Sequence, residues 1–457
     1  MAVTLSQQPS NIINAAYSDI VYVLQGGATT QFYHKYVLQV FVGNSTGINK
    51  VATLKASANE NGKGIFNIAN ILQDFCTTDK EGYVDPSNVA TATFDGVGAN
   101  MVRHSIHQTD AFSANTDNVK QFYVKFTEEY ATTADGIVTQ QALSAPTTKK
   151  LVFNATHEHA NGLDTFDGFQ YCLSSTSSKL LTGFDSSINR KVRRGDFHTL
   201  AFLAGTFGSV AAQQSYPSHF EVQLYTYNGV ALGSAITINV DTSNNAFPVS
   251  LFNWSAGFTG TEGALWHFGC GVANFVNNGL TIPDPNTQSY TIQAFNQTTP
   301  ISEIYTFDII DDDCKGFETI RLAYLNRLGT YDYYNFTKKS TRTTAVQKNT
   351  FKSSYGTWQG NNYTYGTWEG GTNNYGVTAN ETIEANTDFI SEAEAAALEE
   401  LFTSPSVFMQ NDTTSYYAYE PVVITESSYV KQTRANDKVI QYVIGLHKSH
   451  NKRIQRL

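Results

Sequence analysis

Apolar and polar residues alternate along much of the chain, in short runs that end at turn-forming residues. In the run 32–43, the even-numbered residues from Tyr36 to Val42 are apolar and share one side of an extended chain. A period of two residues predicts β-strands that bury one face. The runs 19–25 and 50–59 have the same character. This pattern predicts a mainly β protein built of consecutive β-sandwich-like domains.

Two segments contain turn sequences that predict hairpins. Asn228-Gly229 lies between alternating runs at 220–226 and 236–240, which predicts a two-residue turn. The segment 320–336 (IRLAYLNRLGTYDYYNF) alternates up to Asn326 and becomes aromatic after Gly329. Gly329 supplies the positive φ that a bulged hairpin needs, so this segment is predicted to form strand, turn and strand.

Helical patterns are few and short. In residues 65–76 (IFNIANILQDFC), Ile68, Ile71 and Leu72 have helical spacing. In residues 391–402 (SEAEAAALEELF), Ser391 precedes Glu394 by three positions, which is the pattern of a capping box. A short helix is predicted in each segment, and the second is the short C-terminal helix of the fold.

An aromatic-rich insertion is predicted at 346–385. Its part 354–376 (SYGTWQGNNYTYGTWEGGTNNYG) repeats Tyr-Gly-Thr-Trp and contains no aliphatic residue. Such a segment cannot build a core of its own, so an exposed loop or hairpin is predicted. Exposed rings stack on sugars or on the apolar surface of a partner. The predicted contact residues, including three of the hairpin at 320–336, are Tyr355, Trp358, Tyr365, Trp368, Tyr331, Tyr333 and Tyr334.

Composition and charge disfavour some classes of function, nucleic-acid binding among them. Charged residues are 15% of the chain, against about a quarter in a typical globular protein. The net charge is −10, which disfavours general nucleic-acid binding because that function needs a basic face. The basic stretches 190–194 and 448–456 are short and are interpreted as solvated surface or subunit contacts. No nucleic-acid partner is expected.

Cysteine usage and the absence of targeting segments suggest assembly in a reducing cytoplasm. The four cysteines have no metal-binding spacing and are typical of small buried apolar residues. The first residues lack the basic and apolar regions of a secretory signal. No run of about eighteen apolar residues occurs, so no membrane span is expected.

Metal-binding patterns are incomplete everywhere. His157 and His159 share one side of an extended chain, but no third ligand accompanies them, and the pair His104 and His107 is equally weak. Residues 311–313 are three successive aspartates, yet a calcium loop needs a ligand at about every second residue, a glycine and a closing glutamate. No metal and no cofactor is therefore expected.

Catalytic motifs are also missing. The chain has no G-x-S-x-G elbow and no glycine-rich phosphate loop followed by Lys and Ser or Thr. Paired carboxylates of a glycosidase leave no local signature, so that chemistry stays open at this point. Nothing in the chain demands catalysis, and the expectation is a protein that is not an enzyme.

Several motifs occur in an order that resembles one family. The hairpin 320–336 is similar to the fl-N-x-l-G-g-x-D-x-y-x-F hairpin of structural proteins of tailed bacteriophages, notably phages of Bacteroidetes and marine bacteria. The region 389–447 resembles the short helix, ELF-x-S-P-x-V and VVIT-x-x-S-Y-x-x-K sequences that commonly follow it. The opening F-x-x-KYV strand and GIFNIANILQDF fit the same pattern. Residues 147–300 match no such motif, and the Tyr-Gly-Thr-Trp insertion departs from the pattern.

The resemblance implies a structural component of a virion tail that forms a ring or an attachment layer. Its partners would be copies of itself and other virion tail proteins, and it would be located in the virion after assembly in the bacterial host cytoplasm. The alternative is a receptor- or glycan-binding tail fibre protein that contacts a host surface glycan. A tailspike-type polysaccharide hydrolase comes third, because the short repeats of a parallel β-helix are not visible. The predicted domains are 1–146, 147–300 and 301–457, the last with the insertion 346–385 and the helix 391–402.

Overall fold

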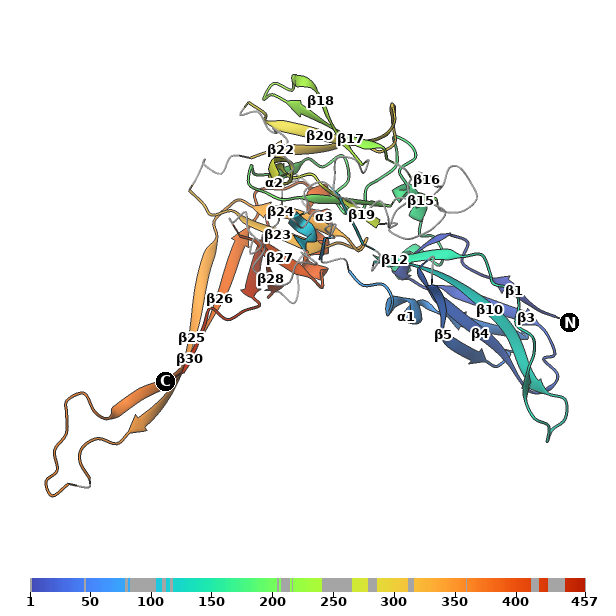
Figure 1. Cartoon of the computed structure of the whole chain (residues 1–457), viewed down its shortest axis with the longest axis horizontal. Helices are drawn as coiled ribbons and strands as arrows, with labels where there is room; N and C mark the ends of the chain where they lie inside the picture. Colours follow the sequence, from blue (N-terminus) through green and yellow to red (C-terminus); the bar gives the residue numbers. More distant parts are fainter. Residues whose placement is uncertain are drawn as a thin grey trace, which may run out of the picture. The chain divides into compact units, whose positions relative to one another are not determined.

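The computed structural model contains mostly β-strands, with three short α-helices (Figure 1). The prediction of a mainly β protein with sandwich-like packing is confirmed. The helices are α1 (Ala69–Gln73), α2 (Val272–Asn277) and α3 (Glu392–Thr403). The structure describes residues 2–44, 47–78, 81–82, 104–108, 112–115, 118–203, 205–206, 214–215, 217–240, 265–277, 286–310, 316–358, 360–411, 419–425 and 440–456.

The chain divides into two compact units, and the division is not a single cut. The first unit contains residues 1–311 and 325–332, and the second contains residues 312–324 and 333–457. The chain therefore passes between the units three times. The predicted boundary at 300/301 lies near the division at 311. The predicted boundary at 146/147 falls inside the first unit, because strands on either side of it pair with each other.

One sandwich of the first unit packs a large sheet against a small one around an apolar core. The large sheet has the order β2-β12-β10-β4-β5, with β11 beside β10, and the small sheet has the order β1-β3-β6. These strands are β1 (Val3–Gln7), β2 (Ile13–Tyr17), β3 (Val21–Gly26), β4 (Phe32–Asn44), β5 (Gly47–Ala56), β6 (Lys63–Asn67), β10 (Val119–Ala131), β11 (Thr139–Gln140) and β12 (Lys150–Thr156).

The first helix is shorter than the sequence pattern predicts. Residues 63–67 form β6, which pairs with β3, so the predicted helix 65–76 is reduced to α1. Ile65 is exposed whereas Phe66 is buried, which is the alternation of a strand. Strand pairing therefore overrides the helical spacing over the first part of this segment.

The second sandwich of the first unit is formed by the order β13-β22-β20-β17-β18, with β21 beside β20, and by β14-β19-β9. Stacked aromatic rings fill its core; Phe220 and Phe268, from opposite sheets, have centroids 4.4 Å apart. The strands are β9 (Phe112–Asn115), β13 (Arg190–Val192), β14 (Thr199–Leu203), β17 (His219–Tyr225), β18 (Ala231–Asn239), β19 (Leu265–Gly269), β20 (Ser289–Asn296), β21 (Thr299–Pro300) and β22 (Tyr305–Ile309).

Short elements complete the first unit. A further apolar cluster contains Leu151 of the first sandwich, Leu203 of the second and Leu328 of the hairpin at 320–336. The remaining elements are β7 (Glu81–Gly82), β8 (His104–Ser105), β15 (Gly205–Thr206), β16 (Gln214–Ser215) and the 3₁₀ helices at Ile106–Gln108, His159–Asn161 and Gly168–Tyr171.

The Asn-Gly hairpin exists, but its turn is not the predicted two-residue turn. The amide of Gly229 donates to the carbonyl of Thr226 at 2.9 Å, and the amide of Thr226 donates to the carbonyl of Val230 at 2.9 Å. Gly229 has a φ of 71°, whereas Asn228 is not among the residues of positive φ. A type I′ turn would need positive φ at both positions, so the glycine here forms a bulge after a wider turn.

The second unit is built on one sheet with the order β24-β23-β27-β28-β29-β26-β25, and β30 pairs with β26. Helix α3 buries Leu398 and Leu401, and the side chain of Ser391 accepts a hydrogen bond from the amide of Glu394 at 3.2 Å. The predicted C-terminal helix and its cap are confirmed. The strands are β23 (Ile320–Leu325), β24 (Tyr331–Phe336), β25 (Thr341–Ser353), β26 (Gly371–Asn386), β27 (Val407–Gln410), β28 (Tyr419–Ile424), β29 (Val443–Lys448) and β30 (Arg453–Arg456).

No helix among the described residues is long and apolar enough to cross a membrane.

Candidate functional site

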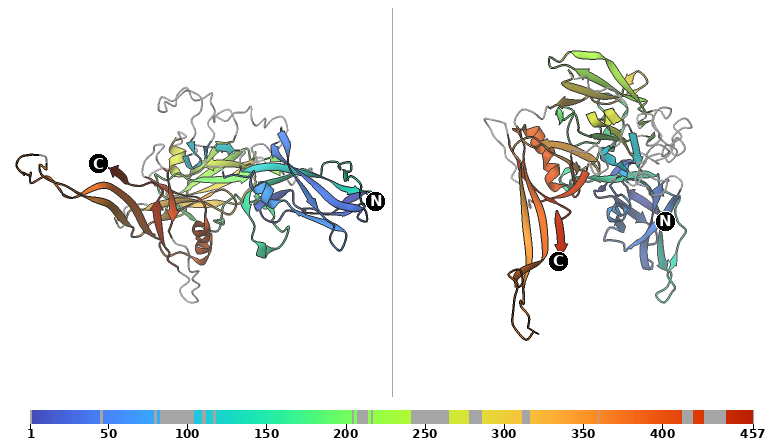
Figure 2. Two further views of the ribbon diagram at one scale, coloured as in Figure 1. Left: turned by 90° about the horizontal axis from the view of Figure 1, so that it is seen from below. Right: turned by 60° about the vertical axis from the view of Figure 1, so that its left-hand side comes forward.

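The predicted insertion is a long antiparallel hairpin, which we call the arm: strands β25 and β26 and the loop 354–370 between them. The two strands pair from Thr341↔Glu384 to Ser353↔Gly371, so most of the predicted loop 346–385 is strand. The sequence prediction of the loop was too long because β25 is polar on both sides and has no alternation to reveal it. Figure 2 shows the arm extending as a narrow ribbon from the sheet of the second unit.

Strand β25 of the arm is exposed along almost its whole length. Every residue of β25 except Ser353 is exposed, and β25 is the terminal strand of its sheet. Its outer edge therefore presents backbone N–H and C=O groups that pair with no other strand of the described residues. Beyond Gly376, where β30 stops pairing with β26, only two strands remain, and a two-stranded ribbon is at best marginally stable in water unless something packs against it.

Ion pairs fix the root of the arm to the second unit. Arg342 of β25 pairs with Glu381 of β26 at 2.7 Å and also with Glu318, and Lys452 pairs with Glu381 at 3.0 Å. Hydrogen bonds from Arg342 and Lys452 lower the pKa of the Glu381 carboxyl. The root is thus held by a network of charges, whereas the far end has a different chemistry.

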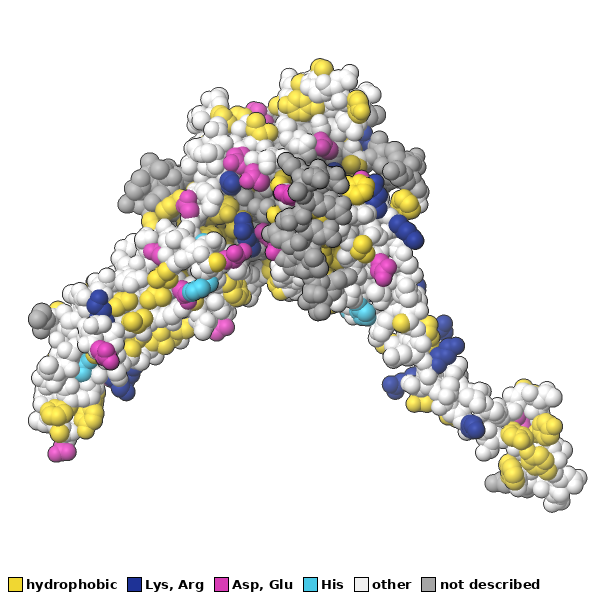
Figure 3. Space-filling view, turned by 180° about the vertical axis from the view of Figure 1, so that it is seen from behind, with side chains coloured by type: hydrophobic (Ala, Val, Ile, Leu, Met, Phe, Trp, Pro, Cys, Tyr) yellow, Lys and Arg dark blue, Asp and Glu magenta, His cyan; other side chains and the backbone are white. Residues whose placement is uncertain are grey.

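Aromatic rings gather at the end of the arm, which we call the tip (residues 354–370). Trp358 and Trp368 are 77% and 84% exposed. The rings contact one another edge to face: Trp358 and Tyr363 have centroids 5.4 Å apart, and Tyr355 and Tyr365 have centroids 5.8 Å apart. Figure 3 shows hydrophobic side chains concentrated there. The tip is therefore an exposed aromatic patch with internal order.

The glycines of the repeated Tyr-Gly-Thr-Trp sequence make room for these rings. A Cβ atom at Gly356 would lie 2.5 Å from the ring of Tyr363, and one at Gly366 would lie 2.6 Å from Nε1 of Trp368. The amide of Thr357 donates to the carbonyl of Thr364 at 2.9 Å, which ties the two repeats together. The repeat is evident in the sequence, whereas the contact of Tyr363 with Trp358 and the space that the glycines leave for the rings are evident only in the folded chain.

Two adjacent glycines allow this packing to be tested. Gly370 and Gly371 have φ angles of 79° and 80°, but only at Gly370 would a Cβ meet a ring, at 2.5 Å from Cβ of Tyr355. Both substitutions to alanine cost roughly 1 kcal/mol for the left-handed backbone. We expect Gly370→Ala to change the near-ultraviolet circular dichroism of the tip and Gly371→Ala to leave it close to wild type. Equal spectra for both variants would contradict the ring packing.

The three tyrosines of the hairpin at 320–336 are not contact residues. Tyr331, Tyr333 and Tyr334 are 2%, 4% and 7% exposed, so the prediction that they face a partner was wrong. The ring of Tyr331 contacts that of His107 at 4.6 Å, and the guanidinium of Arg321 lies 5.0 Å from the ring of Tyr333. These rings are buried in the folded chain. A buried aromatic cluster and an exposed aromatic face have the same sequence pattern, so the sequence did not distinguish them.

The turn of this hairpin is the bulged turn predicted at Gly329, and it contacts residues that are distant in the sequence. We call the residues 326–332 the clasp. Gly329 has a φ of 76°, and its carbonyl accepts from Nδ2 of Asn118 at 2.6 Å. A Cβ there would lie 1.9 Å from the carbonyl oxygen of Asn154. Only glycine fits at this position, on grounds of both backbone angle and space.

Polar side chains of the clasp hold the segment 181–183. The hydroxyl of Thr330 donates to the carbonyl of Leu181 at 2.6 Å. The carboxylate of Asp332 accepts from the hydroxyl of Thr182 at 2.5 Å and from the amide of Gly183 at 2.7 Å. Asn326 also donates to Asp332 at 2.9 Å. The asparagine, glycine and aspartate of the motif thus have a structural role in the first unit.

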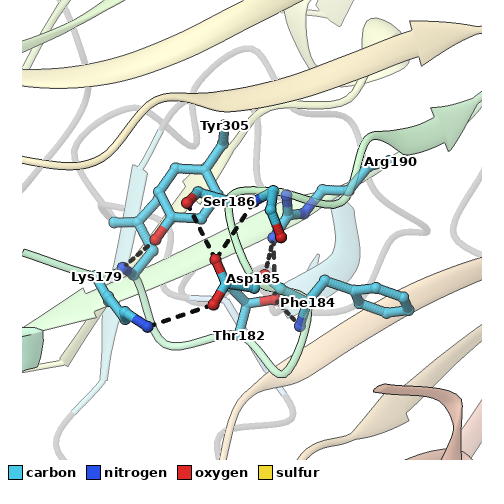
Figure 4. Close-up of polar contacts among 9 residues, drawn as sticks. Lys179, Thr182, Phe184, Asp185, Ser186, Arg190 and Tyr305 are labelled. Atoms are coloured by element: carbon cyan, nitrogen blue, oxygen red, sulfur yellow. Dashed lines mark hydrogen bonds and ion pairs between the residues drawn. The ribbon is translucent and has the colours of Figure 1, made fainter. Parts of the chain in front are cut away.

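A buried arginine lies behind the same segment (Figure 4). Arg190 donates to the carbonyls of Phe184 and Ile188, and its guanidinium lies 4.9 Å from the centroid of the Tyr305 ring. Burial raises the pKa of Asp332 and lowers the pKa of Arg190. Each of these buried groups also favours the charged form of the other, so removing one shifts the pKa of the other.

The histidine motif forms no metal centre with its neighbours. His157 shares a hydrogen bond of 2.9 Å with the hydroxyl of Thr165, and His159 is fully exposed with Nδ1 3.7 Å from Asp19. The described residues contain no group of three or more His, Cys, Asp or Glu that could hold a metal ion. His107 is buried, whereas the side chain of His104 and residues 311–313 lie outside the described residues.

The cysteines that the structure describes are buried thiols. Cys76, Cys172 and Cys270 form no disulfide, and Cys314 lies outside the described residues. Burial raises the pKa of the Cys76 thiol to about 12, so it stays protonated and unreactive at neutral pH. These residues serve as small apolar side chains.

Comparisons with known proteins add no family. No family model and no curated protein matches the chain. Among solved structures, the chain is similar to fibronectin(III)-like modules of Clostridium thermocellum CbhA, at 7% identity over 67% of this chain and 93% of that one, with a TM-score of 0.14. The FN1–FN3 domains of chicken CNTN1 match at 8% identity over 83% and 91%, with a TM-score of 0.16. Scores this low carry no argument, so the class rests on the described geometry: a mainly β chain with sandwich packing and one exposed aromatic arm.

Proposed function

We propose that the chain is a structural component of a bacteriophage virion tail, where it forms a ring or attachment layer with copies of itself and with other tail proteins. The observation that carries this proposal is the outer part of the arm: strand β25 is exposed almost throughout, and the tip presents exposed aromatic rings. The order of motifs along the sequence supplies the virion context. In this role the chain is not an enzyme and needs no cofactor.

The exposed rings explain why a protein partner suits the tip. A buried aromatic side chain removes roughly 150–250 Å² from water. Trp358 and Trp368 keep most of that surface exposed in the isolated chain. Contiguous exposed apolar surface of this kind marks an interaction site. In the assembled layer, the tip would lie against a neighbouring subunit.

A second candidate, a glycan-binding tail fibre protein, is favoured by one observation. Strand β30, from the basic C-terminal stretch, pairs with β26, so that Arg453 and Arg456 join Lys348 and Lys352 on the arm. None of these four side chains has an ion pair with any residue that the structure describes. Cations without an ion-pair partner on an arm that ends in exposed aromatic rings suit an acidic polysaccharide.

The oligomeric state distinguishes these candidates. Sedimentation velocity of the full chain from about 1 to 100 μM is expected to reveal homo-oligomers, and negative-stain images of the heaviest species are expected to contain rings or layers. A chain that stays monomeric throughout this range and binds neither itself nor other tail proteins would refute the structural proposal. A monomer that binds an acidic polysaccharide would favour the second candidate.

A further inference from the structure

The first unit contains a pocket with a volume of about 490 Å³. The end of β2 and the residues after it form one wall, α1 forms another, and the segment 157–166 closes the third side. This segment contains the His-Glu-His motif, for which neither the arm nor the clasp provides a role. The volume lies within the range of about 300–1,000 Å³ that is typical of small-molecule sites.

The lining is rich in groups that both donate and accept hydrogen bonds. Side-chain amides come from three elements, and two imidazoles and three carboxylates accompany them, whereas no lysine or arginine is present. The ring of Tyr17 is 46% exposed at this pocket. The polar lining residues are Asn11, Asn14, Asn67, Asn70, Gln73, Ser18, Asp19, His157, Glu158, His159 and Asp164.

Hydrogen bonds hold the walls in place. Asn67 donates to Asp19 at 2.7 Å, and Asn11 donates to the carbonyl of Phe166 at 2.7 Å. The carboxylate of Asp164 accepts from the amide of Ser10 at 2.6 Å. Asp164 itself has a φ of 60°, a left-handed conformation that costs energy for a residue other than glycine. A strained residue fixed in a pocket wall is typical of a binding site.

The polar side chains of the lining that have no partner indicate which class of ligand the pocket can bind. Asp19 and Asp164 are already engaged, so their charge is partly satisfied, while the side chains of Asn70 and Glu158 have no hydrogen bond to any described residue. The absence of lysine and arginine disfavours anions. An uncharged sugar ring offers alternating hydroxyl donors and acceptors to amides and carboxylates, and an apolar face to an aromatic ring such as that of Tyr17.

We propose that this pocket binds an uncharged sugar residue of a glycan. The inference is independent of the tail-component proposal, because it rests on other residues and predicts binding without assembly. Polar groups that are pre-oriented by the wall bonds would contact the hydroxyls, and the Tyr17 ring would cover one face of the sugar. The site takes neutral rings and rejects acidic ones such as sialic acid.

Saturation-transfer difference NMR with the full chain tests this proposal. The probes are the methyl glycosides of glucose, galactose, mannose and N-acetylglucosamine, with N-acetylneuraminic acid and spermidine as charged comparators. At least one neutral glycoside is expected to bind with a dissociation constant on the order of 1 mM, corresponding to about 4 kcal/mol. We expect Tyr17→Ala and Asn70→Ala each to weaken it roughly fivefold or more, as the loss of one good contact does. Asn61→Ala, an exposed amide outside the pocket, is expected to bind like wild type.

Three outcomes would overturn the proposal. The first is that none of the four neutral glycosides binds. The second is that spermidine binds and the neutral rings do not, which would make the pocket a cation site. The third is that a glycoside binds equally well to the Tyr17 and Asn70 variants, which would place the sugar elsewhere. Sedimentation of the same variants separates this result from the tail-component proposal, because assembly is expected to be unchanged in all of them.

Discussion

Replacement of Asp332 by alanine is expected to lower the free energy of unfolding of the first unit by about 3 kcal/mol or more, because each buried donor left without an acceptor costs about 1–3 kcal/mol. Asp332 is 1% exposed and accepts hydrogen bonds from Thr182, Gly183 and Asn326. The alanine variant would leave these donors without their acceptor and would remove a negative charge that favours the charged form of Arg190. A loss of this size is enough to unfold many domains.

Asp185→Ala is the matched control. It removes an exposed carboxylate from the loop that follows the same segment, where its side-chain partners are the half-buried Ser186 and Lys179 (Figure 4). Exposed interactions of this kind contribute about 1 kcal/mol or less. Both variants are to be unfolded in urea, and unfolding is followed by tryptophan fluorescence. Trp358 and Trp368 are replaced by phenylalanine in both variants. The two remaining tryptophans, Trp254 and Trp266, then report on residues 1–311. Equal midpoints for the two aspartate variants would show that the clasp contributes little.

The double substitution Trp358→Ala and Trp368→Ala is expected to abolish assembly and to leave the folded chain intact. Each ring contributes on the order of 2 kcal/mol or more at the centre of an interface, and the two together correspond to roughly a thousandfold loss of affinity. The stability of the chain should change little, because both rings lie on the surface and pack only within the tip. Sedimentation velocity measures the first effect and thermal unfolding measures the second.

Tyr227→Ala provides the control for this experiment. Tyr227 is 85% exposed, in the turn between β17 and β18, so its substitution removes a comparable exposed ring from another part of the chain. Oligomers are expected to persist in this variant. Oligomers that persist in the double tryptophan variant would contradict the role proposed for the tip. Normal oligomers combined with lost adsorption to host cells would instead support glycan binding by the arm.

The sequence predicted the parts of the fold whose cause is local. Ser391 and Glu394 define the start of α3, and Gly329 defines a bulged turn, because each effect depends on residues within one or two turns. Strand β25 was missed since it exposes both faces and so has no apolar period. The structure of β25 depends on its pairing with β26, and such pairing cannot be predicted from the sequence of either strand alone.

The candidate sites were predictable to a smaller degree. The tip was identified because a segment with rings and no aliphatic residues has few places to be buried. Burial of Tyr331, Tyr333 and Tyr334 depends on contacts with residues far away in the sequence, such as His107, and these contacts have no local signature. The pocket beside α1 unites residues 11–19, 67–73 and 157–166, which only the folded chain brings together.

The discontinuity of the first unit has a consequence for how the protein is made. Leu328 belongs to the apolar cluster of that unit, and Asp332 completes its polar contacts, yet both follow residues 312–324 of the second unit. The ribosome synthesises the chain from the N-terminus, so the first unit lacks Leu328 and Asp332 until the hairpin at 320–336 has emerged. A fragment that ends at residue 311 would keep a hole where Leu328 packs. The first unit can therefore complete its core only after residues 312–324 of the second unit and the segment 325–332 have been synthesised.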